Sequence, residues 1–157
     1  MKTLTIGDLK ARIPIIQGGM GVGISLSGLA SAVANEGGIG VISAAGLGLL
    51  YKKLSPSNYT EAGNLGLAEE IRKAREKAKG IIGVNVMVAL SDFAELVKTS
   101  IAEKVDIIFS GAGLPLDLPS FLKKDSVTKL VPIVSSARAV RIICEKWKNN
   151  YDYLPDA

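Results

Sequence analysis

The feature that most constrains the fold is a repeated alternation between short apolar runs and longer stretches of helical character. Each run is mostly hydrophobic and does not alternate regularly with polar residues, which is typical of parallel strands covered on both faces. The predicted strands are residues 13–17, 39–43, 81–87, 105–109 and 130–134, and the predicted helices are 27–36, 67–79, 91–103, 120–124 and 137–149. Repeated βα units permit either an open doubly wound sheet or a (β/α)8 barrel.

Composition supports a globular α/β chain with one domain over residues 1–157. Hydrophobic residues make up 48% of the sequence and aromatic residues only 5%, so Ile, Val, Leu and Ala must build the core. The net charge is +4, but the basic residues alternate with Glu on predicted helices. A nucleic-acid protein is expected to show a basic stripe interleaved with aromatic residues, which this sequence lacks, so we expect no nucleic-acid partner. No apolar run is long enough for a signal peptide or a membrane span, and we expect a cytoplasmic protein.

The inventory of reactive side chains is narrow. There is no histidine, which excludes Ser-His-Asp and Cys-His schemes and the commonest general base. Cys144 is the only cysteine, which excludes an intrachain disulfide and a Cys-rich metal site. We therefore predict no metal site, and the phosphate-binding G-x-x-x-x-G-K-[ST] loop is also missing.

Small or polar residues follow every predicted strand, at the edge where parallel α/β folds bind ligands. Such residues would let a large flat ligand lie across the strand ends and contact backbone N–H groups, which also hold phosphates. Asn85 interrupts an apolar strand and offers both a donor and an acceptor to the edge of a flavin ring. The remaining candidates are Gly19, Met20, Gly21, Ser110, Gly111, Ala112, Gly113 and Ser135.

Structural explanations for the same residues stay open at this point. Gly and Ser are ordinary turn residues, Asn85 could be a buried structural amide, and Met20 could fill core. Residues 44–66 form the longest irregular stretch, which in a compact domain is usually functional or mobile.

Four motifs in order resemble the nitronate monooxygenase family, formerly called 2-nitropropane dioxygenases. They are IPIIQGGMG (13–21), GGIGVISAAG (37–46), GVNVM (83–87) and DIIFSGAGLP (106–115). The flavin-type enoyl-(acyl carrier protein) reductases are close relatives of that family. The resemblance runs from about residue 13 to residue 157; each motif alone is weak, and the four in register are strong.

The resemblance implies a TIM barrel that binds FMN at its C-terminal face. It implies that Gly19, Met20 and Gly21 lie against the flavin through their backbone, and that Asn85 hydrogen-bonds the cofactor. The loop of Ser110, Gly111, Ala112 and Gly113 would line the substrate pocket, with Ser135 near the flavin. The implied reaction is the oxidation of a small alkyl nitronate by O2.

The resemblance also implies segments that lie beyond Ala157. The family's catalytic His follows in a Gly-Gly-His motif, so no catalytic residue is predicted within this chain. A complete (β/α)8 barrel needs about 250 residues, and the sequence offers five of the eight units. We therefore expect the N-terminal portion of a barrel with open sheet edges, which favour self-association.

Several functions remain open from the sequence. One is nitronate oxidation by the parent enzyme, and a second is flavin-dependent enoyl reduction, in which NAD(P)H supplies the electrons. A third is a catalytically inactive flavin-binding remnant or oligomerisation module, favoured by the absence of histidine. A complete five-stranded flavodoxin-like fold is a fourth reading, but its phosphate loop would be rich in Ser and Thr instead of Gly.

Overall fold

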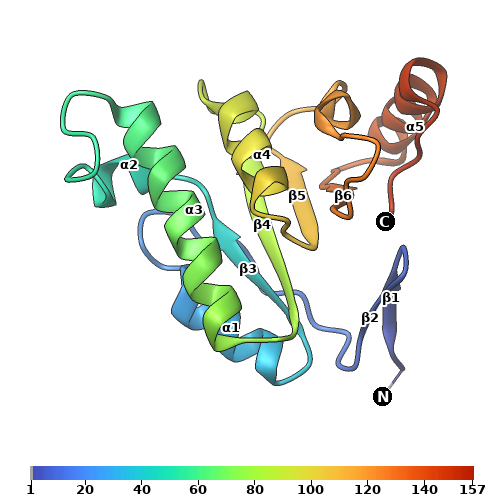
Figure 1. Cartoon of the computed structure of the whole chain (residues 1–157). Coiled ribbons are helices and arrows are strands. Elements are labelled where there is room, and N and C mark those ends of the chain that lie inside the picture. Colours follow the sequence, from blue (N-terminus) through green and yellow to red (C-terminus); the bar gives the residue numbers. More distant parts are fainter. Residues whose placement is uncertain (1) are drawn as a thin grey trace.

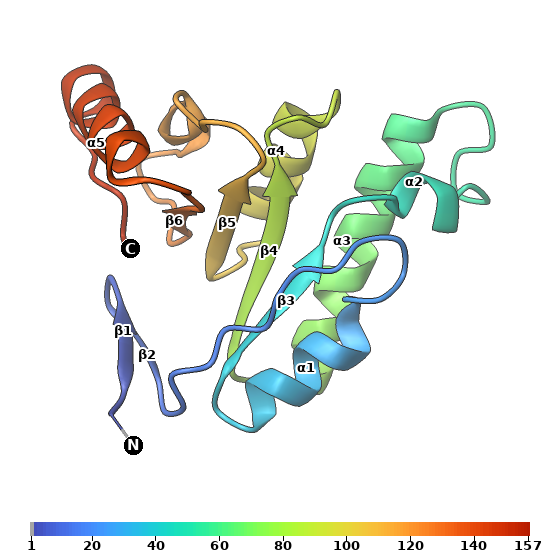
Figure 2. The same cartoon turned by 180° about the vertical axis from the view of Figure 1, so that it is seen from behind.

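A parallel four-stranded sheet in the order β3-β4-β5-β6 forms the centre of the computed structural model, which describes residues 2–157. Figures 1 and 2 show it from its two sides. Its strands are β3 (Ile39–Ser43), β4 (Ile81–Met87), β5 (Ile107–Gly111) and β6 (Lys129–Pro132). The predicted α/β class is confirmed. The bounds of β3 and β4 are as predicted, whereas β5 lies two residues later than predicted and β6 begins one residue earlier.

Helices cover one face of this sheet (Figure 1). They are α1 (Ser27–Asn35), α2 (Leu47–Leu50), α3 (Tyr59–Lys77), α4 (Phe93–Ala102), the 3-10 helix η1 (Leu118–Phe121) and α5 (Ala137–Tyr151). The main core lies between helices and sheet, and its largest side chain is the fully buried Trp147. The helices do not combine, within residues 2–157, the length and the hydrophobicity needed to cross a bilayer.

A hairpin that the sequence analysis did not predict covers part of the other face. Its strands β1 (Leu4–Ile6) and β2 (Leu9–Ala11) pair antiparallel. Ile6 and Ala11 pack there with Ile39, Ile107 and other residues of the sheet in a second, smaller cluster. Figure 2 shows the hairpin near the amino ends of the strands. The carboxyl ends of the same face stay uncovered by it.

The predicted first strand is not a regular strand. Residues 13–17 run beside β3 and form a single parallel bridge, between Ile16 and Ile39. Pro14 has no N–H to donate, and the N–H of Ile15 turns back to the carbonyl of Ile13. This local turn interrupts the ladder that the apolar run alone would predict.

The predicted irregular stretch 44–66 is also largely wrong. It contains α2 and the first two turns of α3, which begins after Asn58, whose side chain accepts a hydrogen bond from the N–H of Glu61. Two glycines of this stretch are close packing positions. An added Cβ would lie 2.5 Å from the carbonyl oxygen of Tyr59 at Gly48 and 2.5 Å from the ring of Tyr51 at Gly66.

Helix starts differ from the prediction in two further places. The N-cap of α4 is Asp92 and not Ser91, and the short helix near residue 120 is the 3-10 turn η1. An i,i+4 ion pair lies on α3, where Lys73 Nζ is 2.5 Å from Glu69 Oε1.

Close contact between α1 and β3 gives a stability prediction. An added Cβ at Gly40 would lie 1.9 Å from the carbonyl oxygen of Ala30, which is backbone and cannot move aside cheaply. Gly40→Ala should therefore lower the free energy of unfolding by about 3 kcal/mol, measured by urea denaturation. Gly28→Ala is the control, because no atom lies within 4 Å of its added Cβ. Since Gly28 lies in α1, that change should stabilise by up to about 1 kcal/mol. Equal losses in the two variants would contradict the close contact.

Candidate functional site

The glycine-rich loop, residues 18–25, lies at the carboxyl end of the sheet and is held by one buried serine. Ser25 Oγ donates to the carbonyl of Gly18 and accepts from the N–H of Met20. The N–H of Ser25 also donates to the carbonyl of Met20, at 2.9 Å, and its own carbonyl accepts from Ser43 on β3. These bonds close the loop on itself and fix it to the sheet.

Gln17 lies directly before the glycine-rich loop, and its side chain binds the backbone of β3. Its amide Nε2 donates to the carbonyl of Val41 at 2.9 Å, and its Oε1 accepts from the N–H of Val41 at 3.2 Å. One side-chain amide therefore supplies both partners that a neighbouring strand would have supplied. The chain can then leave the edge of β3 without orphaning backbone groups there.

A second loop, residues 44–46 between β3 and α2, packs directly on the glycine-rich loop. The N–H of Val22 donates to the carbonyl of Ala45 at 3.0 Å. Val22 has φ +51°, which is strained for a β-branched residue. Gly46 leaves room for it, because an added Cβ there would lie 3.0 Å from Val22 Cγ2. The two loops thus hold each other in one arrangement.

A cavity of about 360 Å³ opens beside the start of the glycine-rich loop, on the face of the sheet opposite the helices. Gly19 and Asn85 border it together, and an added Cβ at Gly19 would lie 2.5 Å from Asn85 Cβ. Phe109 and Val131 supply an apolar wall. The side-chain amide of Asn85 makes no hydrogen bond with any group of residues 2–157. Two predicted site residues, Gly19 and Asn85, therefore meet at one cavity.

The other predicted residues of the first loop lie close by. Gly21 lies against the second loop, where an added Cβ would be 3.1 Å from that of Ala45. Met20 is 64% exposed and so does not fill core. Gly111 makes room for Ile133, which lines the cavity.

The remaining predicted positions lie elsewhere. Ser110 is completely buried and shares its face of β5 with Ile108, which packs against the helices, so its side chain points away from the cavity. Its Oγ has no hydrogen-bond partner among the described residues 2–157. Ala112 and Gly113 follow in positive-φ conformations, with Gly113 beside Val88. Ser135 is exposed and does not line this cavity.

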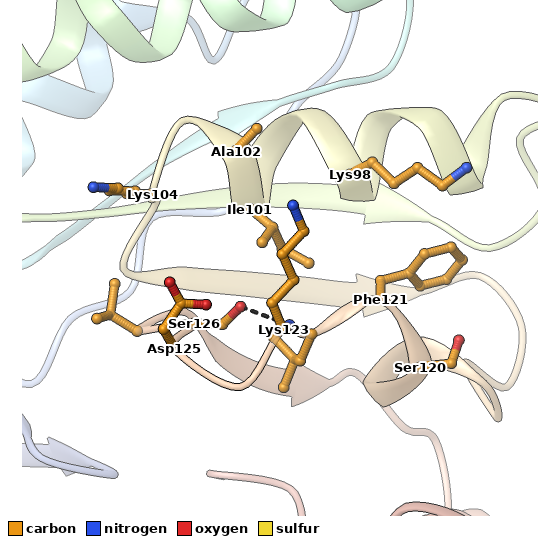
Figure 3. Close-up of a pocket in the computed structure, with 11 residues that line it drawn as sticks. Lys98, Ile101, Ala102, Lys104, Ser120, Phe121, Lys123, Asp125 and Ser126 are labelled. Carbon is orange, nitrogen blue, oxygen red and sulfur yellow. Dashed lines mark hydrogen bonds between the residues drawn. The ribbon is translucent and has the colours of Figure 1, made fainter.

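A larger cavity, of about 720 Å³, lies between α4 and the segment after η1 (Figure 3). Figure 3 shows Ile101 of α4 beside Lys123, whose N–H donates to Ser126 Oγ at 2.9 Å. None of the predicted site residues lines it. We assign the site to the smaller cavity, because only that one lies at the carboxyl ends of the strands.

Glu70 of α3 is the most buried charged residue, at 3% exposure. Its Oε2 accepts from the N–H of Ser27 at 2.6 Å, and its Oε1 accepts from the hydroxyl of Tyr51. Burial opposes ionisation of Glu70, but the hydrogen bonds from Tyr51 and Ser27, with Lys73 at 3.7 Å, outweigh it and lower the pKa of the carboxyl. Burial and the Glu70 carboxylate raise the pKa of Tyr51 to about 12, so this tyrosine keeps its proton at neutral pH.

Sequence reasoning missed Gln17, Ser25 and Glu70. Gln17 carried a signal, because a polar residue ends an otherwise apolar run. Ser25 lies within a loop that was read for its glycines alone. Glu70 had no local signal, since its partner Ser27 lies 43 residues earlier in the chain.

Comparison with known proteins gives the family of the chain. The family model described as "Nitronate monooxygenase" matches residues 2–157. The chain belongs to the nitronate monooxygenase family. No curated protein matches the chain.

Solved structures resemble the chain over most of its length. FabK from Thermotoga maritima is 28% identical with a TM-score of 0.64, covering 85% of this chain and 37% of that one. A point mutant of the same protein gives 30% identity and a TM-score of 0.67, covering 85% and 39%. Nitroalkane oxidase from Streptomyces ansochromogenes is 16% identical with a TM-score of 0.67, covering 87% and 44%, and shows likeness of fold alone. The chain thus spans less than half the length of these relatives, as predicted for part of a TIM barrel.

The lowered pKa of Glu70 predicts a specific dependence of stability on pH. An unfolded carboxyl, with its ordinary pKa of 4.5, binds a proton more readily than the folded one. The ionised Glu70 carboxylate therefore makes its full contribution to the free energy of unfolding above about pH 4.5. This contribution is lost as the pH falls through the lowered folded-state pKa. The difference in unfolding free energy between wild type and Glu70→Gln should stay constant from about pH 6 to 8 and shrink below about pH 4.5. A difference that grows on acidification would contradict the assigned direction.

Proposed function

We propose that this chain carries the flavin-contacting part of an FMN-dependent oxidoreductase that oxidises alkyl nitronates with O2. The observation that carries the proposal is the meeting of Gly19 and Asn85 at a cavity at the carboxyl ends of the strands, in a chain of the nitronate monooxygenase family. The substrates would be a small nitronate and O2, and the expected setting is the cytoplasm.

The residues at the cavity fit a flavin ring. Asn85 presents an amide that has no hydrogen-bond partner within residues 2–157, and the edge of a flavin ring alternates donors and acceptors. The N–H groups of Gly19 and Gly21 likewise donate no hydrogen bond to the described residues 2–157. Phe109 and Val131 offer an apolar surface to a flat ring. Polar groups and apolar wall therefore suit the same ligand.

Each part of the site has a defined task under this proposal. Asn85 and the backbone of Gly19 and Gly21 would hold and orient the cofactor. Phe109 and Val131 would exclude water from the ring. When bound, FMN supplies the redox chemistry, taking electrons from a carbanion-like substrate and passing them to O2. We assign no proton transfer to these residues, since the family resemblance puts the catalytic His beyond Ala157.

Flavin-dependent enoyl reduction with NAD(P)H is the second candidate. The motifs also resemble the enoyl-(acyl carrier protein) reductases, and the identity to the FabK structures, 28% and 30%, exceeds the 16% to nitroalkane oxidase. The two candidates share the cofactor and differ in the electron donor. FMN-loaded protein that consumes O2 with propyl-2-nitronate would support the first, and FMN-loaded protein that oxidises NADPH with a crotonyl thioester would support the second. Bound FMN with neither reaction would leave this chain a flavin-binding module.

Removal of the Asn85 amide tests the cofactor assignment. Asn85→Ala should raise the Kd for FMN, followed by flavin fluorescence, about tenfold, which corresponds to the loss of about one net hydrogen bond. Asn149→Ala is the control, because it removes the same amide from an exposed position late in α5 and should leave the Kd unchanged. An unaltered Kd in Asn85→Ala would contradict the assigned role.

A further inference from the structure

The glycine-rich loop borders the cavity, and the second loop packs on it. Each loop is followed by a segment that hydrogen-bonds the same buried carboxylate. The glycine-rich loop ends two residues before Ser27, and the second loop leads through α2 to Tyr51. Both Ser27 and Tyr51 donate hydrogen bonds to Glu70 of α3. We propose that Glu70 is a positioning residue that holds the two loops in the arrangement that receives the flavin. The flavin part of this inference rests on the proposed function.

At the glycine-rich loop, Glu70 takes the place of a local helix cap. The N-cap of α1 is Leu26, which has no side chain that can accept a hydrogen bond from the first turn. The N–H of Ser27 donates to Glu70 instead. A carboxylate at a helix N-terminus is favoured by the exposed N–H groups and by the helix dipole. The start of α1, and with it the end of the loop, is therefore fixed by another helix.

At the second loop, the contact is made through a tyrosine that is itself confined. The Tyr51 ring packs on Gly66 of α3, where a side chain would collide with it. Lys73 Nζ lies 5.6 Å from the centre of the same ring and 3.7 Å from Glu70 Oε1. Lys73 also pairs with Glu69, so Lys73, Glu69 and Tyr51 are the ionisable groups beside Glu70. The Tyr51 hydroxyl has one defined direction, toward the carboxylate.

The loops need such a support because their own contact is strained. Val22 keeps a positive φ that costs on the order of 1–3 kcal/mol and persists only where surrounding contacts impose it. Its one backbone hydrogen bond in this contact goes to Ala45 of the other loop. Movement of either loop would release Val22 and shift Gly19 relative to Asn85. Glu70 bonds to the segments following both loops, so it can oppose that movement from either side.

Hydrogen exchange of the chain without FMN tests the support directly. In Glu70→Gln and in Tyr51→Phe, the amides of Val22, Ser25 and Ser27 should exchange about tenfold faster than in wild type, since opening then costs one hydrogen bond less. The amides of β4 should exchange as in wild type. Glu76→Gln is the control, because it removes an exposed carboxylate of the same helix that makes no ion pair within residues 2–157, and it should leave all of these rates unchanged.

FMN titration of the same variants supplies the second readout. Glu70→Gln and Tyr51→Phe should raise the Kd for FMN about fivefold to tenfold, and Glu76→Gln should leave it unchanged. Faster exchange throughout the chain, or unchanged exchange in the two loops, would overturn the proposal; so would faster loop exchange with an unaltered Kd. If Glu70→Gln fails to fold, Tyr51→Phe decides alone. If the wild-type chain binds no FMN, the proposed function fails, while loop-specific exchange still supports Glu70 as the support of both loops.

Discussion

The parallel register of the sheet is the constraint on which the site depends. Backbone pairing of β3 with β4, β4 with β5 and β5 with β6 aligns Ser43, Asn85, Phe109 and Val131 in one row. Paired residues on neighbouring strands point to the same face. The polar pair of Ser43 and Asn85 therefore lies beside the apolar pair of Phe109 and Val131. A slip of one residue would turn the whole row toward the helices. The cavity therefore exists because the register is fixed, and close packing such as that of Gly40 on α1 helps to fix it.

Side chains complete the structure wherever the backbone leaves the sheet. Gln17 supplies both partners of Val41 at the edge of β3, and Ser25 closes the glycine-rich loop. Asp156 does the same at the other edge, since its N–H and its carboxylate bond the carbonyl and the N–H of Leu130. Asp106, just before β5, bonds Ile82 of β4 in the same way: its N–H donates to the carbonyl of Ile82, and its carboxylate accepts from the N–H of Ile82. Because side chains pair with these backbone groups of the strands, the chain can leave the sheet there on an irregular path.

The sequence predicted the elements whose cause is local. Continuous apolar runs located β3 and β4, because burial on both faces leaves no alternation in the sequence. The prediction was wrong where a distant partner decides. The first two turns of α3 were predicted to be irregular, because the packing of Gly66 on Tyr51 is not visible in the sequence. For the site, the sequence singled out Gly19 after one predicted strand and Asn85 inside another, but their direct contact is seen only in the structure. Ser110 was expected in the loop after a strand that ends at residue 109, but β5 runs to Gly111, and its alternation turns Ser110 toward the helices.

The central claim is that the flavin binds at Gly19 and Asn85 and not in the larger cavity beside α4. A titration of the ¹⁵N-labelled chain with FMN, followed by amide chemical shifts, tests it most directly. The account predicts shifts at the backbone amides of Gly19 and Gly21 and at the side-chain amide of Asn85, with Lys123 and Ser126 unaffected. Shifts confined to Lys123, Ser126 and their neighbours, or no shifts at any FMN concentration, would contradict it.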